Sequence, residues 1–178
     1  MLTKIRHYVT TDTLRNIYYG IFSSLLNYGS QIWGQYQNTN IKRIMKLQNK
    51  AIRVINFAKY RDTSSNLYQK SEILKLQDNI TMNNFLYMHD SLKRRLPTTL
   101  NDRFSYLCDT HEYETRNSDL KCVKLPTSRT LVYGIHSIDG QSTRAWNYLQ
   151  VNCSSHKLHT LSRNVCKKIL KSHFIDSY

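Results

Sequence analysis

The chain has 178 residues, and its 26 Lys and Arg against 12 Asp and Glu give a formal charge of +14. Hydrophobic residues make up 40% and aromatic residues 11%, which is typical of a folded protein rather than of a disordered tail. The charge favours a polyanionic partner. The first residues lack the apolar core of a secretory signal, and no apolar run approaches the roughly 20 residues that span a bilayer. Four cysteines are too few and too far apart for a disulfide scaffold, so we expect an intracellular protein with no membrane partner.

The positive charge is concentrated at the two ends of the chain. Residues 1–60 hold nine basic residues and one acid, residues 61–120 hold eight and nine, and residues 121–178 hold nine and two. This segmentation favours two anion-facing surfaces, and chance clustering on solvated faces is the alternative.

Helices dominate the prediction for the first half of the chain. Apolar residues recur with helical spacing after an expected Thr11-Asp12 cap and stop at Gly29, which predicts a helix over 12–28. Further helices are predicted over 40–58, over 65–71 and from Gln77 to about Arg95. We expect the three longer helices to form a small antiparallel bundle over residues 1–97.

The second half is predicted to be less regular. Leu120–Leu125 and Thr130–Ile135, separated by a turn at Pro126, predict a short β-hairpin. A last basic helix is predicted over 156–174. Its apolar side would comprise Leu158, Leu161, Val165, Ile169 and Phe174. The predicted fold class is therefore mainly α, with a helical domain over 1–97 and a basic C-terminal region over 98–178 that contains the hairpin and the last helix.

The helix predicted over 40–58 carries a row of cations without acidic neighbours. Its basic side comprises Lys42, Arg43, Lys46, Lys50 and Arg53. No acid lies between Asp12 and Asp62, so no partner is available one helical turn away. Like charges in a row destabilise an isolated helix slightly, so the row favours an external anion such as a phosphate backbone. A solvated lysine face is the alternative.

No catalytic motif is recognised. The sequence has no Gly-rich phosphate loop, no nucleophile elbow and no adjacent acids, whereas metal-dependent polymerases and nucleases need clustered carboxylates. We therefore expect that this chain alone is not an enzyme and needs no cofactor. A zinc site is the minor alternative, because the spacing fits neither of the usual ligand patterns. Its ligands would be Cys108, His111, Cys153 and His156, with ordinary packed cysteines and surface histidines as the favoured interpretation.

Several motifs occur in the order found in one family. The run Tyr18–Gly34, the helix Ile44–Ile55 with Leu47-Gln48-Asn49-Lys50-Ala51-Ile52-Arg53, and the link Ile73–Asp78 resemble a region downstream of the catalytic core in non-LTR (LINE-type, jockey-like) retrotransposon reverse transcriptases. The order continues through Tyr113–Arg116, Pro126 with Arg129, and Trp146–Leu149 to the Lys-rich end. The resemblance implies a fragment or degenerate remnant that holds the thumb and C-terminal region without the palm, whose aromatic-x-Asp-Asp metal site is absent.

The resemblance also implies a supporting role in binding nucleic acid. Thumb helices of the family grip the template–primer duplex, so the basic row would contact phosphates, and the region around Trp146 and the last helix would make a second contact with RNA or DNA. The candidate residues of this second region are Arg116, Arg129, Arg144, Trp146, Arg163, Lys167, Lys168 and Lys171. The expected partners are RNA or DNA and the missing palm, and the expected location is nuclear if the protein is expressed. An independent basic helical module that binds nucleic acid or an acidic protein is the alternative.

Overall fold

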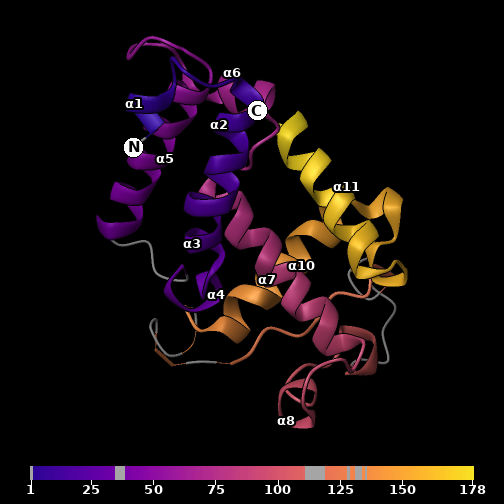
Figure 1. Cartoon of the computed structure of the whole chain (residues 1–178). Coiled ribbons are helices and arrows are strands. Elements are labelled where there is room, and N and C mark those ends of the chain that lie inside the picture. Colours follow the sequence, from indigo (N-terminus) through magenta and orange to yellow (C-terminus); the bar gives the residue numbers. More distant parts are fainter. Residues whose placement is uncertain (1, 35–38, 111–118, 128, 131–133, 135) are drawn as a thin grey trace. The chain divides into compact units, whose positions relative to one another are not determined.

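The computed structural model describes residues 2–34, 39–110, 119–127, 129–130, 134 and 136–178. Within these residues the regular elements are helices, and the described part of the chain contains no strand (Figure 1). The mainly α fold class is therefore confirmed. Among the described helices, none is both long and apolar enough to cross a membrane.

The chain forms two compact units. Unit 1 comprises Met1–Ser30, Gln37–Ile80 and Lys171–Tyr178, and unit 2 comprises Gln31–Tyr36 and Thr81–Leu170. The functional division at residue 97 stays a prediction.

The predicted first helix is present in unit 1, with a wider segment in its middle. Helix α2 (Thr11–Ile17) continues into a π-helical segment, η1 (Tyr18–Ser23), and then into α3 (Ser24–Asn27). The cap lies one residue earlier than predicted, because the Thr10 hydroxyl accepts the hydrogen bond from the Thr13 N–H at 3.3 Å. Gly29 follows with a φ of 61°, a conformation that glycine adopts without strain, and the helix ends there as predicted.

Three further helices belong to the first unit. Helix α5 (Thr39–Ile55) packs with α2, and both α1 (Leu2–Ile5) and α6 (Ser64–Ser71) pack with α5 (Figure 1). Helix α5 ends three residues before the predicted limit, because Phe57 adopts a left-handed conformation with a φ of 54°. The buried core of this unit comprises Leu14, Tyr18, Ala51, Ile52, Ile55, Tyr68 and Ile73.

Unit 2 is built around a buried aromatic pair. Phe85 of α7 (Leu76–Leu92) stacks on Trp146 of α10 (Ile138–Asn152), with ring centroids 4.8 Å apart and planes 13° apart. The imidazole of His89 is also buried and lies 3.0 Å from the carbonyl oxygen of Leu161. Helix α10 was not predicted. Its N-cap is Ser137, whose hydroxyl accepts a hydrogen bond from the Gly140 N–H at 3.1 Å and so caps the first turn.

The predicted β-hairpin is not supported. Val123 pairs instead with Tyr106 in an isolated antiparallel bridge, flanked by a 2.9 Å hydrogen bond from the Leu107 N–H to the Cys122 carbonyl. Residues 131–133 and 135 of the expected second arm lie outside the described residues. Three further short elements are α4 (Ser30–Trp33), α8 (Thr98–Asn101) and the 3-10 turn η2 (Leu107–Asp109), the last of which directly follows Tyr106.

The last helix begins later than predicted. Two 3-10 turns, η4 (Ser154–His156) and η5 (Leu158–Thr160), precede α11 (Arg163–Asp176), and Lys157 between them has a φ of 43°. Of the predicted apolar side, Leu158 and Phe174 are buried as expected, but in the middle of the helix the buried positions are displaced by one residue. Cys166, Leu170 and Phe174 are buried, whereas Val165 is 42% exposed.

Candidate nucleic-acid interface

The predicted basic side of α5 faces solvent. We call Lys42, Arg43, Lys46, Lys50 and Arg53 the α5 basic row. The first four side chains are exposed and Arg53 is partly exposed. The opposite side of the helix is buried through Ile41, Ala51 and Ile52. Lys42, Lys46 and Lys50 follow one another at intervals of one helical turn, so their ammonium groups share one face. No ion pair to this row is present among the described residues, which leaves its charge available to an external anion.

Arg53 differs from the other members of the row. Its Nε donates a hydrogen bond to the carbonyl oxygen of Asp62 at 3.2 Å, and its guanidinium lies 5.9 Å from the ring centroid of Tyr60. These contacts hold Arg53 against the segment that follows α5. Lys42, Arg43, Lys46 and Lys50 are therefore the more exposed cations of the row.

A buried amide fixes the helix that carries this row. Gln48 donates hydrogen bonds from Nε2 to the Tyr18 hydroxyl at 3.0 Å and to the Leu74 carbonyl at 2.9 Å. Its Oε1 accepts a hydrogen bond from the Leu76 N–H at 2.9 Å. The Gln48 amide thus satisfies groups on η1 and on the link before α7 at once. Burial raises the pKa of Tyr18 to about 12, and the hydrogen bond from Gln48 partly opposes that rise.

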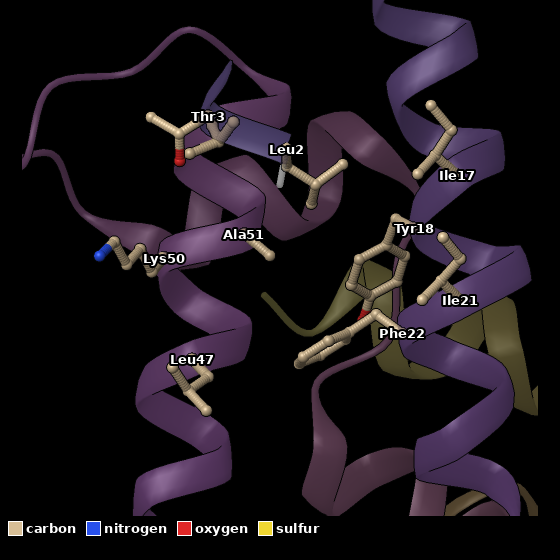
Figure 2. A pocket seen from close by; sticks show the side chains of 10 residues that line it. Leu2, Thr3, Ile17, Tyr18, Ile21, Phe22, Leu47, Lys50 and Ala51 are labelled. Carbon is tan, nitrogen blue, oxygen red and sulfur yellow. The ribbon is translucent and has the colours of Figure 1, made fainter. Parts of the chain in front are cut away.

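An apolar groove lies beside the row, between η1 and α5. Figure 2 shows its lining side chains, with the Lys50 ammonium directed away from the Tyr18 and Phe22 rings. The groove has a volume of about 330 Å³. Its described lining comprises Leu2, Thr3, Ile17, Tyr18, Ile21, Phe22, Leu47, Lys50, Ala51 and Val54. Ile21 and Leu47 remain largely exposed at its mouth.

In unit 2, the predicted aromatic contact is a core residue. Trp146 is 1% exposed, stacks on Phe85 and donates a hydrogen bond from Nε1 to the Lys121 carbonyl at 3.0 Å. Its ring therefore has no free face for a nucleobase in this structure. Arg144, two residues earlier on α10, is exposed.

The remaining predicted cations have different surroundings. Arg163 donates from Nε to Asp90 at 2.8 Å, so its charge is partly neutralised. Lys167 and Lys168 of α11 are exposed, as is Arg129, and Lys171 is partly exposed. Arg116 lies outside the described residues. The α5 basic row thus lies on one helix, whereas the cations predicted for the second nucleic-acid contact are distributed over several segments.

The cysteines show no clustered metal ligands among the described residues. No group of three or more His, Cys, Asp or Glu side chains there could hold a metal ion, and His111 lies outside the described part. Cys122, Cys153 and Cys166 are buried, and that burial raises the pKa of each thiol. Cys108 is partly exposed, with the Lys121 ammonium 3.4 Å from its sulfur.

Two residues of interest escaped the sequence prediction. Gln48 was recognised only as part of a motif. Its structural role was missed because its three hydrogen-bond partners, a phenol and two backbone groups, lie far from it in the sequence. Tyr148 is 57% exposed on α10, two positions from the buried Trp146. If α10 had been predicted as a helix, Trp146 and Tyr148 would have been placed about 200° apart around its axis, on opposite sides.

Comparison with known proteins shows a partial similarity to a curated protein. The chain is 34% identical over 88 residues to a probable RNA-directed DNA polymerase from the transposon X-element of Drosophila melanogaster. The match covers 48% of this chain and 10% of that polymerase. The similarity supports a reverse-transcriptase-related origin for the chain. No protein-family profile matches it, and no solved structure matches it at a significant level.

Proposed function

We propose that this chain is a nucleic-acid-binding part of a non-LTR, jockey-like reverse transcriptase, corresponding to its thumb and C-terminal region. In this proposal the α5 basic row contacts the phosphates of a template–primer duplex, and no catalytic step is assigned to the chain itself. A nuclear location would follow from that role.

The observation that carries this proposal is the exposed row of α5. Lys42, Lys46 and Lys50 lie on one face of a helix whose other face is buried, with no ion pair among the described residues. A phosphate backbone presents negative charges at regular spacing, and each lysine that neutralises a phosphate releases a counterion. The partial similarity to a transposon polymerase supports the choice of nucleic acid over an acidic protein.

The apolar groove of unit 1 supports a second part of the proposal. Ile21 of η1 and Leu47 of α5 line this groove and are exposed, and monomeric proteins rarely leave contiguous apolar surface open. We assign this surface to contact with the palm of the same polymerase. In a longer chain that includes the palm, backbone hydrogen exchange in η1 and α5 should slow relative to the present chain.

The proposal is tested by the salt dependence of duplex binding. The whole chain should bind a labelled RNA–DNA duplex with an affinity that falls steeply with salt, and replacement of the α5 lysines should reduce that slope. An acidic-protein module would bind the duplex no better in the wild type than in the lysine variant.

A further inference from the structure

The outer face of α10 places an exposed aromatic ring beside a groove of unit 2. Tyr148 is 57% exposed, and Arg144 and Asn152 lie one turn before and one turn after it on the same face. The groove has a volume of about 430 Å³. Its described lining comprises Leu107, Cys122, Asn147, Tyr148, Val151 and Asn152.

One wall of the groove is held rigidly. The Asn147 side chain accepts a hydrogen bond from the Val123 N–H at 2.8 Å and donates one to the Val123 carbonyl at 2.9 Å. The buried Trp146 adds a hydrogen bond to the Lys121 carbonyl. The segment 121–123 is therefore fixed along α10, and a ligand that enters the groove does not have to order it.

The charge around the groove suits an anion bearing an apolar ring. Arg144 is exposed, and Asp139 on the same helix pairs with Arg103 at 3.0 Å, so it does not neutralise Arg144. The Lys121 ammonium lies 3.4 Å from the sulfur of Cys108, next to the groove residue Leu107. Asp109 accepts a hydrogen bond from that thiol at 3.5 Å, but the described residues that line the groove include no acid.

We propose that this face binds single-stranded nucleic acid, with one base stacked on the Tyr148 ring at the groove and a neighbouring phosphate on Arg144. An exposed aromatic ring beside a cation is the arrangement that single-strand-binding surfaces use, because every base has a face that can stack. A duplex satisfies its own base stacking, so it offers no free base to Tyr148. This inference rests on the proposed nucleic-acid binding and supplies the aromatic contact in unit 2 that the buried Trp146 cannot make.

The experiment compares single strands with a duplex for the whole chain. Fluorescence anisotropy would measure dissociation constants for labelled 16-nucleotide oligo(U), 16-nucleotide oligo(dT) and a 16-base-pair RNA–DNA duplex. Tyr148→Ala should weaken binding of at least one single strand by about 5-fold to 150-fold, the range for stacking one base. Tyr148→Phe should stay near the wild type, and duplex binding should change less than twofold. The two single-strand probes distinguish RNA from DNA.

A matched control variant and a crosslinking measurement on the unmodified chain complete the test. Tyr8→Ala removes another tyrosine, 87% exposed and in unit 1, and should leave all three affinities unchanged. Oligo(U) that carries one 4-thiouridine should crosslink to the α10 peptide that contains Tyr148 in the unmodified chain, whether or not Tyr148→Ala folds.

The failures of the two proposals are distinguishable. Equal affinities of Tyr148→Ala and wild type for both single strands, an equal loss on the duplex, or crosslinks only outside α10 would overturn the Tyr148 site while leaving the α5 contact intact. Absence of binding of the wild type to all three probes would overturn the proposed function and this inference together.

Discussion

The side-chain oxygen of Gln48 accepts a hydrogen bond at 2.9 Å from the backbone N–H of Leu76, the first residue of α7. The same amide donates to the Leu74 carbonyl, so α5 and the link before α7 are joined through one buried side chain. Gln48 and the link Ile73–Asp78 belong to two separate motifs that resemble reverse transcriptase segments. The two motifs are in direct contact in the fold, because the link supplies the backbone groups that form hydrogen bonds with the Gln48 amide.

This contact predicts a large loss of stability for Gln48→Leu. The substitution removes three hydrogen bonds and leaves the buried Leu76 N–H without its partner. Each net hydrogen bond contributes about 1 kcal/mol, and an unsatisfied buried group costs about 1–3 kcal/mol, so we expect a loss of roughly 3 kcal/mol in the free energy of unfolding. Urea unfolding followed by circular dichroism measures it. Gln69→Leu makes the same change at an exposed position of α6 and should cost under 1 kcal/mol. Equal effects of the two substitutions would contradict the role of Gln48.

The buried phenol of Tyr18 predicts an alkaline loss of stability. Burial raises its pKa from 10.0 to about 12, so the folded chain holds the proton more tightly than the unfolded chain does. The stabilisation is complete below pH 10 and is lost as the pH rises toward 12. Between pH 9 and 11.5 the unfolding free energy of the wild type should fall by about 1–2 kcal/mol more than that of Tyr18→Phe. Parallel curves for the two proteins would argue against this account of Tyr18.

The two kinds of cation on α11 should respond differently to removal. Arg163 pairs with Asp90 at 2.8 Å, so Arg163→Ala should lower stability by about 1 kcal/mol and barely change the salt dependence of binding. Lys167 and Lys168 are exposed without an ion pair among the described residues. Their double substitution by Ala should preserve stability and reduce the salt slope by up to about 1.8. Thermal melting and salt-dependent anisotropy on the same samples separate the two effects, and a reversed pattern would remove the α11 lysines from the interface.

Burial predicts an order of reaction for the four thiols. Cys122, Cys153 and Cys166 are buried, with thiol pKa values raised by that burial, whereas Cys108 is partly exposed. Iodoacetamide at pH 8 should alkylate Cys108 at least about tenfold faster than the other three, because reaction needs an accessible thiolate. A time course by peptide mass spectrometry follows each site, with the urea-unfolded chain as control. Comparable native rates at all four sites would contradict the burial of Cys122, Cys153 and Cys166.

The strongly periodic part of the sequence was sufficient to predict most of the fold. The helices over 12–28 and 40–58 were predicted from apolar spacing, and α2 with η1 and α3, and α5, confirm them. The helix over 65–71 was predicted from a start signal at Thr63-Ser64-Ser65, and α6 confirms it. Helix α10 was missed because polar residues such as Ser142, Thr143 and Gln150 are buried in it, which obscures the apolar pattern. On α11 the prediction was right for Phe174 but wrong for Val165, because the small thiol of Cys166 occupies the core position that had been assigned to Val165.

The candidate site could likewise be predicted only in part from the sequence. The α5 basic row was predictable, since exposed lysines at turn spacing follow directly from the helix period. The burial of Trp146 was not predictable from its position alone, because an aromatic residue beside a cation suits both a core and a stacking surface. The bracing role of Gln48 depends on backbone groups about 26 to 28 residues away, which no local pattern contains.

The central claim is tested most directly by the salt dependence of duplex binding. Lys42, Lys46 and Lys50 would be replaced together by Ala, and the control would replace the exposed Lys4, Lys59 and Lys70, which removes the same charge elsewhere in unit 1. The α5 variant should reduce the magnitude of the log–log salt slope by up to about 2.7, or about 3.6 with Arg53 included, at about 0.9 per phosphate contact. It should also be at least as stable as the wild type, because repulsion along the helix is relieved. Equal slopes for the wild type, the α5 variant and the control would contradict the assignment of α5 to the phosphate backbone.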